Sequence, residues 1–382
     1  MSKIGILTFH RSKNYGAFLQ CLALSNQLSK DFPKADVEVI DYTKKCAVDS
    51  YFRFQVKNCI KHPSFIKNTV SRNRMFTRYQ TLLPLSKKKL VNDKLDAFDA
   101  FVKDRYDAIV VGSDVVWGID PNHFPSPYWL HNQKCKKLSY AAASHGTDYN
   151  FLSSNIRKYC SESLNDFDYI GVRDKSTELF VKSITSHNVV HHNCDPTLLL
   201  DMSDIPADMN HLQKKIKKLP GYDSNKKTIG LMMSDPYITS LLKNSFGKEY
   251  NIIAIYTSNP LLKCCLYDID VFEWANIFSL FSVTVTTFFH GTLFSLKNNT
   301  PVISVNIKKQ DEKYMGKTED ILTRLGMKDC FFHKSYIQQN EKQFVDKIHE
   351  QINNDSNRIE IALNKERQYY YGFYKAMTQI II

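Results

Sequence analysis

The sequence predicts an α/β fold of two doubly wound domains, each built on a parallel sheet. Apolar, β-branched runs alternate with segments of helical spacing along most of the chain, which is typical of strand–helix–strand units. The alternation is interrupted by a polar, Lys-rich stretch at residues 201–227, which contains Pro206, Pro220 and Gly221. A length of 382 residues suits two domains of about 100–200 residues, each able to bury its own core.

In the first half of the chain, predicted strands and helices alternate from the N-terminus onward. A short apolar run opens the sequence, and Gly16 begins a segment with apolar residues at helical spacing. Residues 107–111 show the consecutive apolar side chains of a strand that is buried on both faces. The predicted strands are residues 3–9, 37–42, 107–111, 138–143, 169–172, 189–192 and 197–200, and the first helix covers residues 16–30.

The second half repeats the pattern after the polar stretch. Strands are expected at residues 228–233, 250–256, 282–286 and 301–305, and helices at residues 237–246, 271–279, 291–298 and 317–325. The tail from residue 341 is helical and amphipathic and could cross back onto the first domain.

These elements divide the chain into three parts. We expect a Rossmann-like N-terminal domain at residues 1–205 with a basic helical insertion near 43–92, a Rossmann-like C-terminal domain at 226–340, and a helical segment at 341–382. Two such domains bind ligands in the crevice between the carboxyl ends of their strands. The residues that directly follow strands are therefore the candidates for function.

The composition excludes several classes of protein. The nine cysteines are odd in number and scattered, and no Cys-x-x-Cys occurs, which argues against a disulfide framework and against a zinc site. Free thiols suit a reducing cytoplasm. The N-terminus resembles a strand more than a signal peptide, and no run of about 18 apolar residues predicts a membrane span. No Gly-x-Gly-x-x-Gly or Walker motif points to a dinucleotide or nucleoside triphosphate.

Almost all of the excess positive charge lies in residues 43–92. This window holds twelve Lys or Arg and one acid, Asp49, so it carries +11 of the net charge of +12. Aromatic and aliphatic residues such as Phe52, Val56 and Ile60 are interleaved with the cations. One interpretation is a patch for an anionic partner such as a membrane surface, a diphospholipid or nucleic acid. The other is a solvated basic insertion that packs its aromatic face on the domain.

Three loops that follow first-domain strands carry polar or aromatic side chains. Asn14 and Tyr15 lie in a polar loop that leads into a helix, whose N-terminus could meet an anion. Asp114 could cap a helix, and Trp117 could wall a pocket. His145 follows a run of small residues and could serve as an acid or an anion contact. A capped loop, core packing and a surface histidine are the plainer interpretations of the same residues.

Two more strand ends carry a charged or titratable side chain. Arg173 ends a strand and begins a helix, and its planar guanidinium suits a carboxylate or phosphate, or a salt bridge to Asp174 or a neighbour. His290 directly follows a β-branched strand and precedes a helix that we expect to begin at Gly291. The positive end of that helix favours an anion beside the imidazole.

Taken in order, these segments resemble the polysaccharide pyruvyl transferase family. The motifs stand in the family's order and spacing from residue 4 to about 326; each is weak alone, whereas the ordered set is specific. They are Ile4-Gly5-Ile6-Leu7-Thr8-Phe9 with Asn14-Tyr15-Gly16-Ala17 and Gln20, Gly112-Ser113-Asp114 with Trp117, Ser139-Tyr140-Ala141-Ala142, Val172-Arg173-Asp174, Asp195-Pro196-Thr197 and Phe289-His290-Gly291-Thr292.

The resemblance implies a GT-B-like fold and an activity. Phosphoenolpyruvate would be the donor, and a hydroxyl pair of a sugar in a bacterial capsule or exopolysaccharide precursor would be the acceptor. The products would be a pyruvate ketal and phosphate, with no metal or cofactor. The resemblance implies that His290 is essential and that Arg173 contacts the donor carboxylate or phosphate. We assign the remaining roles as hypotheses: Asp114 and His145 are catalytic with His290; His290, Gly291, Thr292 and Lys317 contact the donor with Arg173; and Asn14, Tyr15 and Trp117 contact the acceptor.

The sequence departs from the family pattern at two positions. Phe288 stands where some members carry Arg, and Lys317 stands where many carry Arg. Two alternatives therefore stay open: a nucleotide-sugar glycosyltransferase of the same fold, for which Glu273 could bind the ribose, and a non-catalytic binding protein of a glycan pathway.

The expected partners follow from the same resemblance. They are phosphoenolpyruvate and a lipid-linked or oligosaccharide sugar acceptor, with peripheral contact to the inner membrane face if residues 43–92 meet lipid. Nucleic acid is not expected, because the basic window has no recognised reading motif. We expect a cytoplasmic location.

Overall fold

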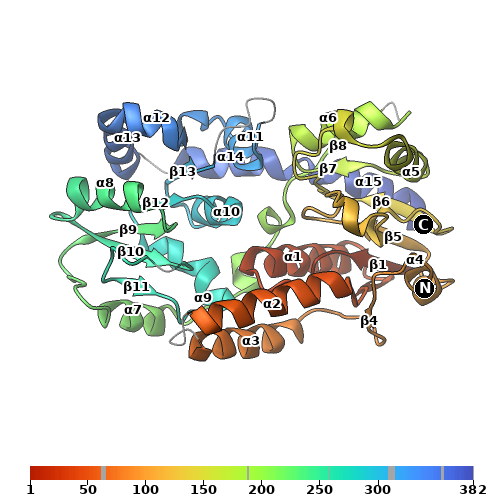
Figure 1. Cartoon of the computed structure of the whole chain (residues 1–382), viewed down its shortest axis with the longest axis horizontal. Coiled ribbons are helices and arrows are strands. Elements are labelled where there is room, and N and C mark those ends of the chain that lie inside the picture. The colour runs from red at the N-terminus through yellow and green to blue at the C-terminus, as the bar shows by residue number, and fades with distance from the viewer. Residues whose placement is uncertain (62–65, 187–188, 258, 309–314, 354–356, 382) are drawn as a thin grey trace. The chain divides into compact units, whose positions relative to one another are not determined.

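The computed structural model describes residues 1–61, 66–186, 189–257, 259–308, 315–353 and 357–381. The chain divides into two compact units, whose elements are labelled in Figure 1. Unit 1 comprises Met1–Leu200 and Arg367–Ile382, and unit 2 comprises Asp201–Glu366. Both units are α/β structures with a parallel sheet, as the sequence predicts.

The main sheet of unit 1 has four parallel strands in the order β2 (Asp36–Val39), β1 (Lys3–Leu7), β5 (Ala108–Val111) and β6 (Lys136–Ser139). Ile4 pairs with Val37 on one side and with Ala108 on the other. All four residues of β5 are buried, because helices cover both faces of a parallel sheet. Two short parallel pairs accompany it: β3 (Tyr42–Thr43) with β4 (Leu90–Val91), and β7 (Gly171–Val172) with β8 (His191–His192).

Unit 2 contains a parallel sheet of six strands. Their order is β11 (Cys265–Leu266), β10 (Tyr250–Ile255), β9 (Lys227–Met232), β12 (Val283–Thr286), β13 (Val302–Asn306) and β14 (Phe331–His333). Its helices are α7 (Met209–Lys217), α8 (Pro236–Phe246), α9 (Val271–Asn276), α10 (Phe289–Lys297), α11 (Lys317–Arg324), α12 (Lys334–Gln339) and α13 (Glu341–Asn353). The predicted elements of this half lie within a few residues of the observed ones.

The helices of unit 1 are α1 (Tyr15–Asp31), α2 (Lys45–Lys61), α3 (Ile66–Gln80), α4 (Leu95–Val102), α5 (Ser154–Asn165), α6 (Lys175–Ile184) and α15 (Tyr370–Ile381). Short polar residues explain where several helices of both units begin. The side chains of Asn14, Ser153, Asp174, Asp208, Asp235 and Asp270 each accept a hydrogen bond from an amide of the following helix. Such a cap stabilises a helix by about 0.5–2 kcal/mol.

The strand predicted at residues 197–200 is wrong. Pro196–Leu198 forms a 3-10 turn instead. The carboxylate of Asp195 accepts hydrogen bonds from the backbone N–H of Thr197 at 3.0 Å and from its hydroxyl at 2.7 Å. This local capping competes with an extended chain, and it turns the segment back.

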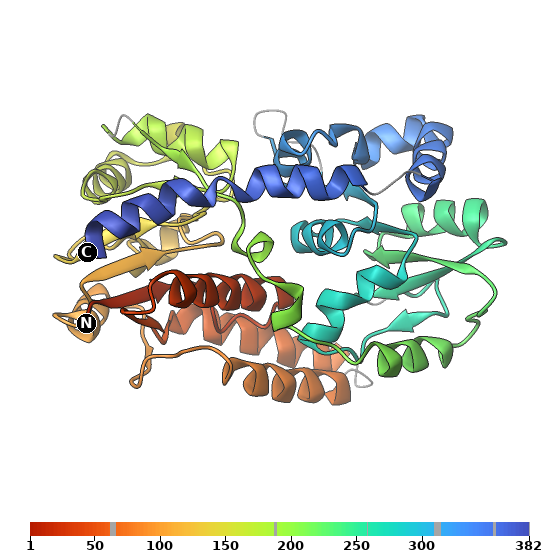
Figure 2. The same cartoon turned by 180° about the vertical axis from the view of Figure 1, so that it is seen from behind.

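The C-terminal segment is shared between the two units. α14 (Asn357–Arg367) contains the boundary, and α15 packs on unit 1, where the two chain termini lie near each other (Figure 2). Tyr370 donates a hydrogen bond to Asp31 at 2.5 Å, and the buried ring of Phe373 lies 4.8 Å from that of Tyr140. α15 therefore contributes to the core of unit 1.

Candidate functional site

His290 lies in the first turn of α10, directly after β12. The sequence placed the start of this helix at Gly291, but the structure starts it at Phe289. The Thr286 hydroxyl accepts a hydrogen bond at 3.0 Å from the backbone N–H of Phe288, the residue that precedes the helix. The half-buried imidazole thus lies in the first turn of a helix, whose N-terminus carries partial positive charge.

Gly291 and Thr292 hold this turn against the sheet. A Cβ on Gly291 would lie 2.7 Å from the Thr286 hydroxyl and 2.8 Å from Met232 Sδ, so glycine permits the close approach. Thr292 is fully buried; its hydroxyl donates to the Phe288 carbonyl at 3.2 Å and shares a hydrogen bond with Ser304 at 2.8 Å. The side chain predicted as a donor contact therefore faces the sheet and fixes the position of His290.

Lys317, the first residue of α11, lies on the same side of unit 2. Its Nζ is 5.2 Å from the ring centroid of Phe289, whose centroid is 5.2 Å from that of His290. A cation at a helix N-terminus is opposed by the helix dipole, and the face of the aromatic ring partly offsets that repulsion. The ammonium group of Lys317 and the N-terminus of α10 are the features of this part of unit 2 that suit a phosphate or carboxylate.

In unit 1, Arg173 and Asp114 are brought together by the ends of β7 and β5. Arg173 Nη1 donates to Asp195 at 3.1 Å, and Nη2 lies 3.5 Å from Asp114 Oδ1. The side chains of Arg173 and Asp195 are 1% exposed, whereas that of Asp114 is 18% exposed. Burial lowers the pKa of Arg173, but the charges of Asp195 and Asp114 outweigh it and raise the pKa, so the guanidinium stays charged.

Asp114 stands on a distorted loop after β5. Its φ is +79°, in the left-handed region that asparagine, aspartate and glycine tolerate best. Gly112 has φ +121°, and a Cβ there would collide with the carbonyl oxygen of Tyr140. Unusual backbone of this kind concentrates at functional sites, and here it presents the Asp114 carboxylate at the end of the sheet.

The remaining predicted residues of unit 1 take structural positions. Asn14 caps α1 by accepting from the Ala17 amide at 3.2 Å, and the buried Tyr15 stacks on Phe76 with centroids 5.5 Å apart. His145 lies on an exposed loop after β6 with φ +59°.

Trp117 requires a correction. It is fully buried in the core of unit 1, stacks on Trp129 at 5.7 Å and donates its indole N–H to the Tyr128 carbonyl. A large apolar ring gains more from the core than from a polar loop, so Trp117 does not wall an open pocket for an acceptor.

The sequence reasoning missed a buried histidine–aspartate–arginine cluster at the ends of β1 and β2. His10 Nε2 lies 3.0 Å from Asp41, and Arg11 Nε donates to the same carboxylate at 2.6 Å. Burial alone would raise the pKa of Asp41, but the hydrogen bonds from His10 and Arg11 outweigh it and hold that pKa well below its usual value. The available signal was that His10 and Asp41 closely follow adjacent parallel strands, whose carboxyl ends meet.

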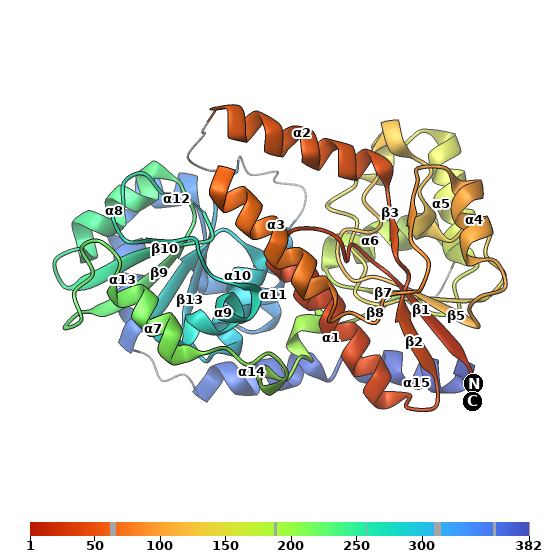
Figure 3. The same ribbon diagram turned by 90° about the horizontal axis from the view of Figure 1, so that it is seen from below.

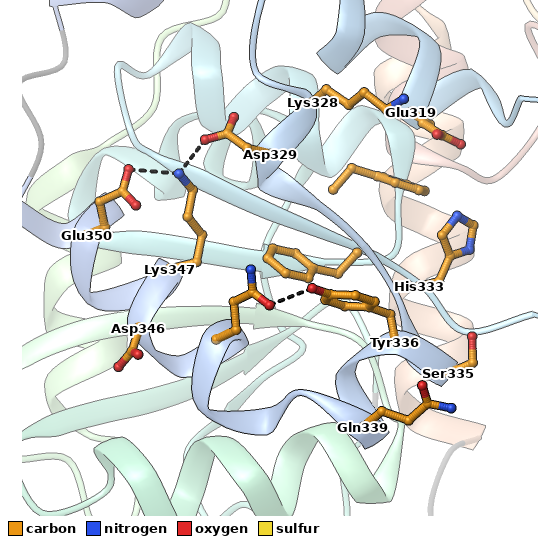
Figure 4. Close-up of a pocket in the computed structure, with 13 residues that line it drawn as sticks. Glu319, Lys328, Asp329, His333, Ser335, Tyr336, Gln339, Asp346, Lys347 and Glu350 are labelled. Atoms are coloured by element: carbon orange, nitrogen blue, oxygen red, sulfur yellow. Dashed lines mark hydrogen bonds and ion pairs between the residues drawn. The ribbon is translucent and has the colours of Figure 1, made fainter.

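A hollow of about 740 Å³ in unit 2 lies at the edge strand β14 and α13, and none of the predicted site residues lines it (Figure 4). Its lining includes four acids, Glu319, Asp329, Asp346 and Glu350, and two lysines, Lys328 and Lys347. Lys347 already bridges Asp329 and Glu350, the latter at 2.7 Å. An excess of carboxylates repels a multiply charged anion. This hollow is therefore unsuited to phosphoenolpyruvate.

Within the described part of the chain, no three His, Cys, Asp or Glu side chains group so as to hold a metal ion. Nor does any helix among the described residues have the length and apolar character needed to cross a bilayer.

Solved structures with similar folds include UDP-GlcNAc 2-epimerases. That of Methanocaldococcus jannaschii has a TM-score of 0.56 at 10% identity, covering 98% of this chain and 100% of that one. The Neisseria meningitidis epimerase bound to UDP-GlcNAc has a TM-score of 0.52 at 10% identity, covering 97% and 100%. At this identity the likeness concerns the fold, which is GT-B-like: an α/β protein with two parallel sheets.

The chain belongs to the polysaccharide pyruvyl transferase family of enzymes, whose family model it matches over residues 14–309. That range includes Asp114, Arg173 and His290, and it ends before Lys317. No curated protein matches the chain in sequence.

Proposed function

We propose that this enzyme transfers the pyruvyl group of phosphoenolpyruvate to a hydroxyl pair of a sugar in a cell-surface polysaccharide precursor, forming a ketal and releasing phosphate. The family match over residues 14–309 carries the proposal. The cationic end of unit 2 around His290 and Lys317 supports it, because the donor carries a phosphate and a carboxylate.

The reaction needs a proton donor, cations and a base. A proton added to the methylene carbon of phosphoenolpyruvate leaves an oxocarbenium-like centre, which one acceptor hydroxyl attacks with loss of its proton. Phosphate then leaves with the C–O bonding pair, and the second hydroxyl closes the ketal and loses its own proton. Positioned acids and bases each speed such steps by about 10²–10⁴-fold, and fixed cations stabilise the departing phosphate.

We assign the donor to unit 2 and the acceptor to unit 1, as the family resemblance implies. His290 protonates the donor or contacts its phosphate, with Lys317 and the amides of α10 as further anion contacts. Asp114 is the base for the hydroxyl, and His145 assists. Arg173 is the predicted carboxylate contact, and its contacts with Asp195 and Asp114 support a further role in orienting the base.

Glu273, the residue that the nucleotide-sugar alternative would use to bind the ribose, makes structural contacts instead. Glu273 receives two hydrogen bonds from Lys215 at 2.9 and 3.0 Å and one from the Asp270 amide at 3.0 Å. Its carboxylate is 7% exposed and is used to pack α7 on α9 and to close a capping box, instead of facing a ribose.

Calorimetric titration of phosphoenolpyruvate into the wild type and into His290→Ala tests the assignment. We expect binding to the wild type that weakens at least tenfold in the variant, and no binding of UDP-GlcNAc. His211→Ala, at a histidine with 57% side-chain exposure in α7, is the matched control and should bind as the wild type does. Binding of the nucleotide sugar in place of phosphoenolpyruvate would reject pyruvyl transfer.

A further inference from the structure

The helix α2 presents an apolar stripe to solvent. Val48, Phe52, Val56 and Ile60 follow one another at intervals of four residues and are 45%, 64%, 41% and 75% exposed. Residues spaced by four lie on one face of a helix. Figure 3 shows α2 at the margin of unit 1, beside α3. Side chains of this size are normally buried, so a continuous exposed stripe indicates a surface that binds something.

A second stripe of mostly basic residues runs beside the first. Lys45, Asp49, Arg53 and Lys57 have the same spacing of four, each three residues before a member of the apolar stripe. Phe52, Arg53, Val56, Lys57 and Ile60 together border a shallow hollow of about 340 Å³. Apolar side chains flanked by lysine and arginine are the pattern of a helix that lies in a membrane interface.

Two contacts show which residues of α2 attach it to the rest of unit 1. Gln55 donates to Asn73 of α3 at 3.0 Å, and the Tyr51 ring lies 5.1 Å from the ammonium group of Lys13. These contacts attach α2 to unit 1 through Tyr51 and Gln55. The residues of the apolar stripe take no part in these contacts and are exposed.

We propose that α2 docks this enzyme on an anionic phospholipid surface, with the apolar stripe in the interface and Arg53 and Lys57 on the headgroup phosphates. The charge pattern favours this occupant over a second copy of the chain. A symmetric pair through this face would bring Arg53 and Lys57 against their own like charges, whereas an anionic surface neutralises them. The proposal does not depend on the reaction, because docking requires no turnover.

Vesicle co-sedimentation at low salt tests the docking. The wild type should pellet with phosphatidylcholine vesicles that contain phosphatidylglycerol, should remain in solution with phosphatidylcholine alone, and should be released by added salt. The double variant Arg53→Glu/Lys57→Glu should bind at least about 25-fold more weakly, since each basic residue near such a surface raises affinity about fivefold and the new carboxylates are repelled by it.

Two further variants separate the stripe from general basic charge. Phe52→Ser/Ile60→Ser keeps every cation and should also lose binding, while its melting temperature stays unchanged. In Phe52→Trp, the fluorescence of the new indole should shift to the blue when vesicles are added and should be quenched by bromine-labelled lipid. The change can be assigned to residue 52, because Trp117, Trp129 and Trp274 are buried and should not respond.

Three results would overturn the proposal. The first is no binding to phosphatidylglycerol vesicles at low salt, and the second is full binding by Phe52→Ser/Ile60→Ser. The third is a dimer in light scattering that Phe52→Ser/Ile60→Ser dissociates, without vesicle binding by the wild type. Phosphoenolpyruvate is titrated into the same variants as a separate measurement. Loss of vesicle binding concerns the docking surface, whereas absence of phosphoenolpyruvate binding concerns the assignment of the reaction.

Discussion

In unit 1 the arginine at the strand ends is buried between two carboxylates, whereas in unit 2 the lysine that begins α11 lies against the aromatic ring of Phe289. Arg173 and Asp195 are both 1% exposed, and Asp114 adds a second negative charge, so the cluster has no positive charge to spare. In unit 2 the Lys317 ammonium lies 5.2 Å from the centroid of the Phe289 ring, and His290 follows Phe289 in the first turn of α10. We therefore propose different tasks for the two sets of strand ends: orienting a carboxylate in unit 1 and binding an anion in unit 2.

The largest expected effect is that of His290→Ala on turnover. If the imidazole moves a proton, kcat should fall by about 10²–10⁴-fold, because positioned proton transfer contributes that much. Initial rates of phosphate release from phosphoenolpyruvate with acceptor measure it, with His211→Ala as the matched control. Near-normal turnover in His290→Ala would show that His290 does not take part in the reaction, and the role proposed for unit 2 would be lost.

Arg173→Met should chiefly affect stability. It leaves the Asp195 carboxylate buried without its cation, which costs about 3–5 kcal/mol. Urea unfolding measures the change, and Arg53→Met, at an exposed arginine of α2, should stay within about 0.5 kcal/mol of the wild type. A variant that unfolds like the wild type but no longer binds phosphoenolpyruvate would show that Arg173 acts as a donor contact and not as a support.

Asp41→Asn tests the second buried cluster of unit 1. The pKa of Asp41 is depressed in the folded state, so the carboxylate contributes stability above its unfolded pKa of about 3.9 and loses it as pH falls below that value. At pH 7 the variant should be less stable by about 1–3 kcal/mol, because hydrogen bonds to a buried charge are lost. The difference should shrink below about pH 4.

Thermal unfolding between pH 3 and pH 7 measures this convergence. Asp36→Asn alters an exposed carboxylate of the same unit, with 54% side-chain exposure, and should show little difference at either end of the range. A deficit in Asp41→Asn that is constant with pH would mean that shape and not charge stabilises the cluster.

The strand–helix alternation made most of this architecture predictable. The buried parallel strands of unit 2 appear where runs such as residues 228–233 and 282–286 predicted them, because side chains covered on both faces leave an unmistakable apolar run. The strand at residues 197–200 failed because capping by Asp195, a contact within two residues, competes with extension. Local hydrogen bonds of this kind are not visible in hydrophobic periodicity.

The sequence indicated where candidate site residues stand along the chain, but it did not indicate which side chains they contact. The ends of the strands identified Arg173 and His290, but the sequence could not show that Asp195, 22 residues further along, would hold the guanidinium. Trp117 was placed on a pocket wall because a tryptophan after a strand fits either a wall or a core. Only the surrounding residues decide, and here Trp129 and Tyr128 enclose it.

Lys317→Met should produce the smallest change in phosphoenolpyruvate affinity. It tests most directly whether the cation of unit 2 differs in role from Arg173 of unit 1. If the lysine contacts the donor phosphate from a half-buried position, its loss should weaken phosphoenolpyruvate binding about fivefold, since such an ion pair contributes about 1 kcal/mol. Lys317→Arg keeps the charge and should retain most of the affinity, while the melting temperature should be equal in all three proteins. If both variants lost affinity alike, the close contact with the Phe289 ring would be what matters. If neither did, Lys317 would not contact the donor, and the anion contacts proposed for unit 2 would be His290 and the N-terminus of α10.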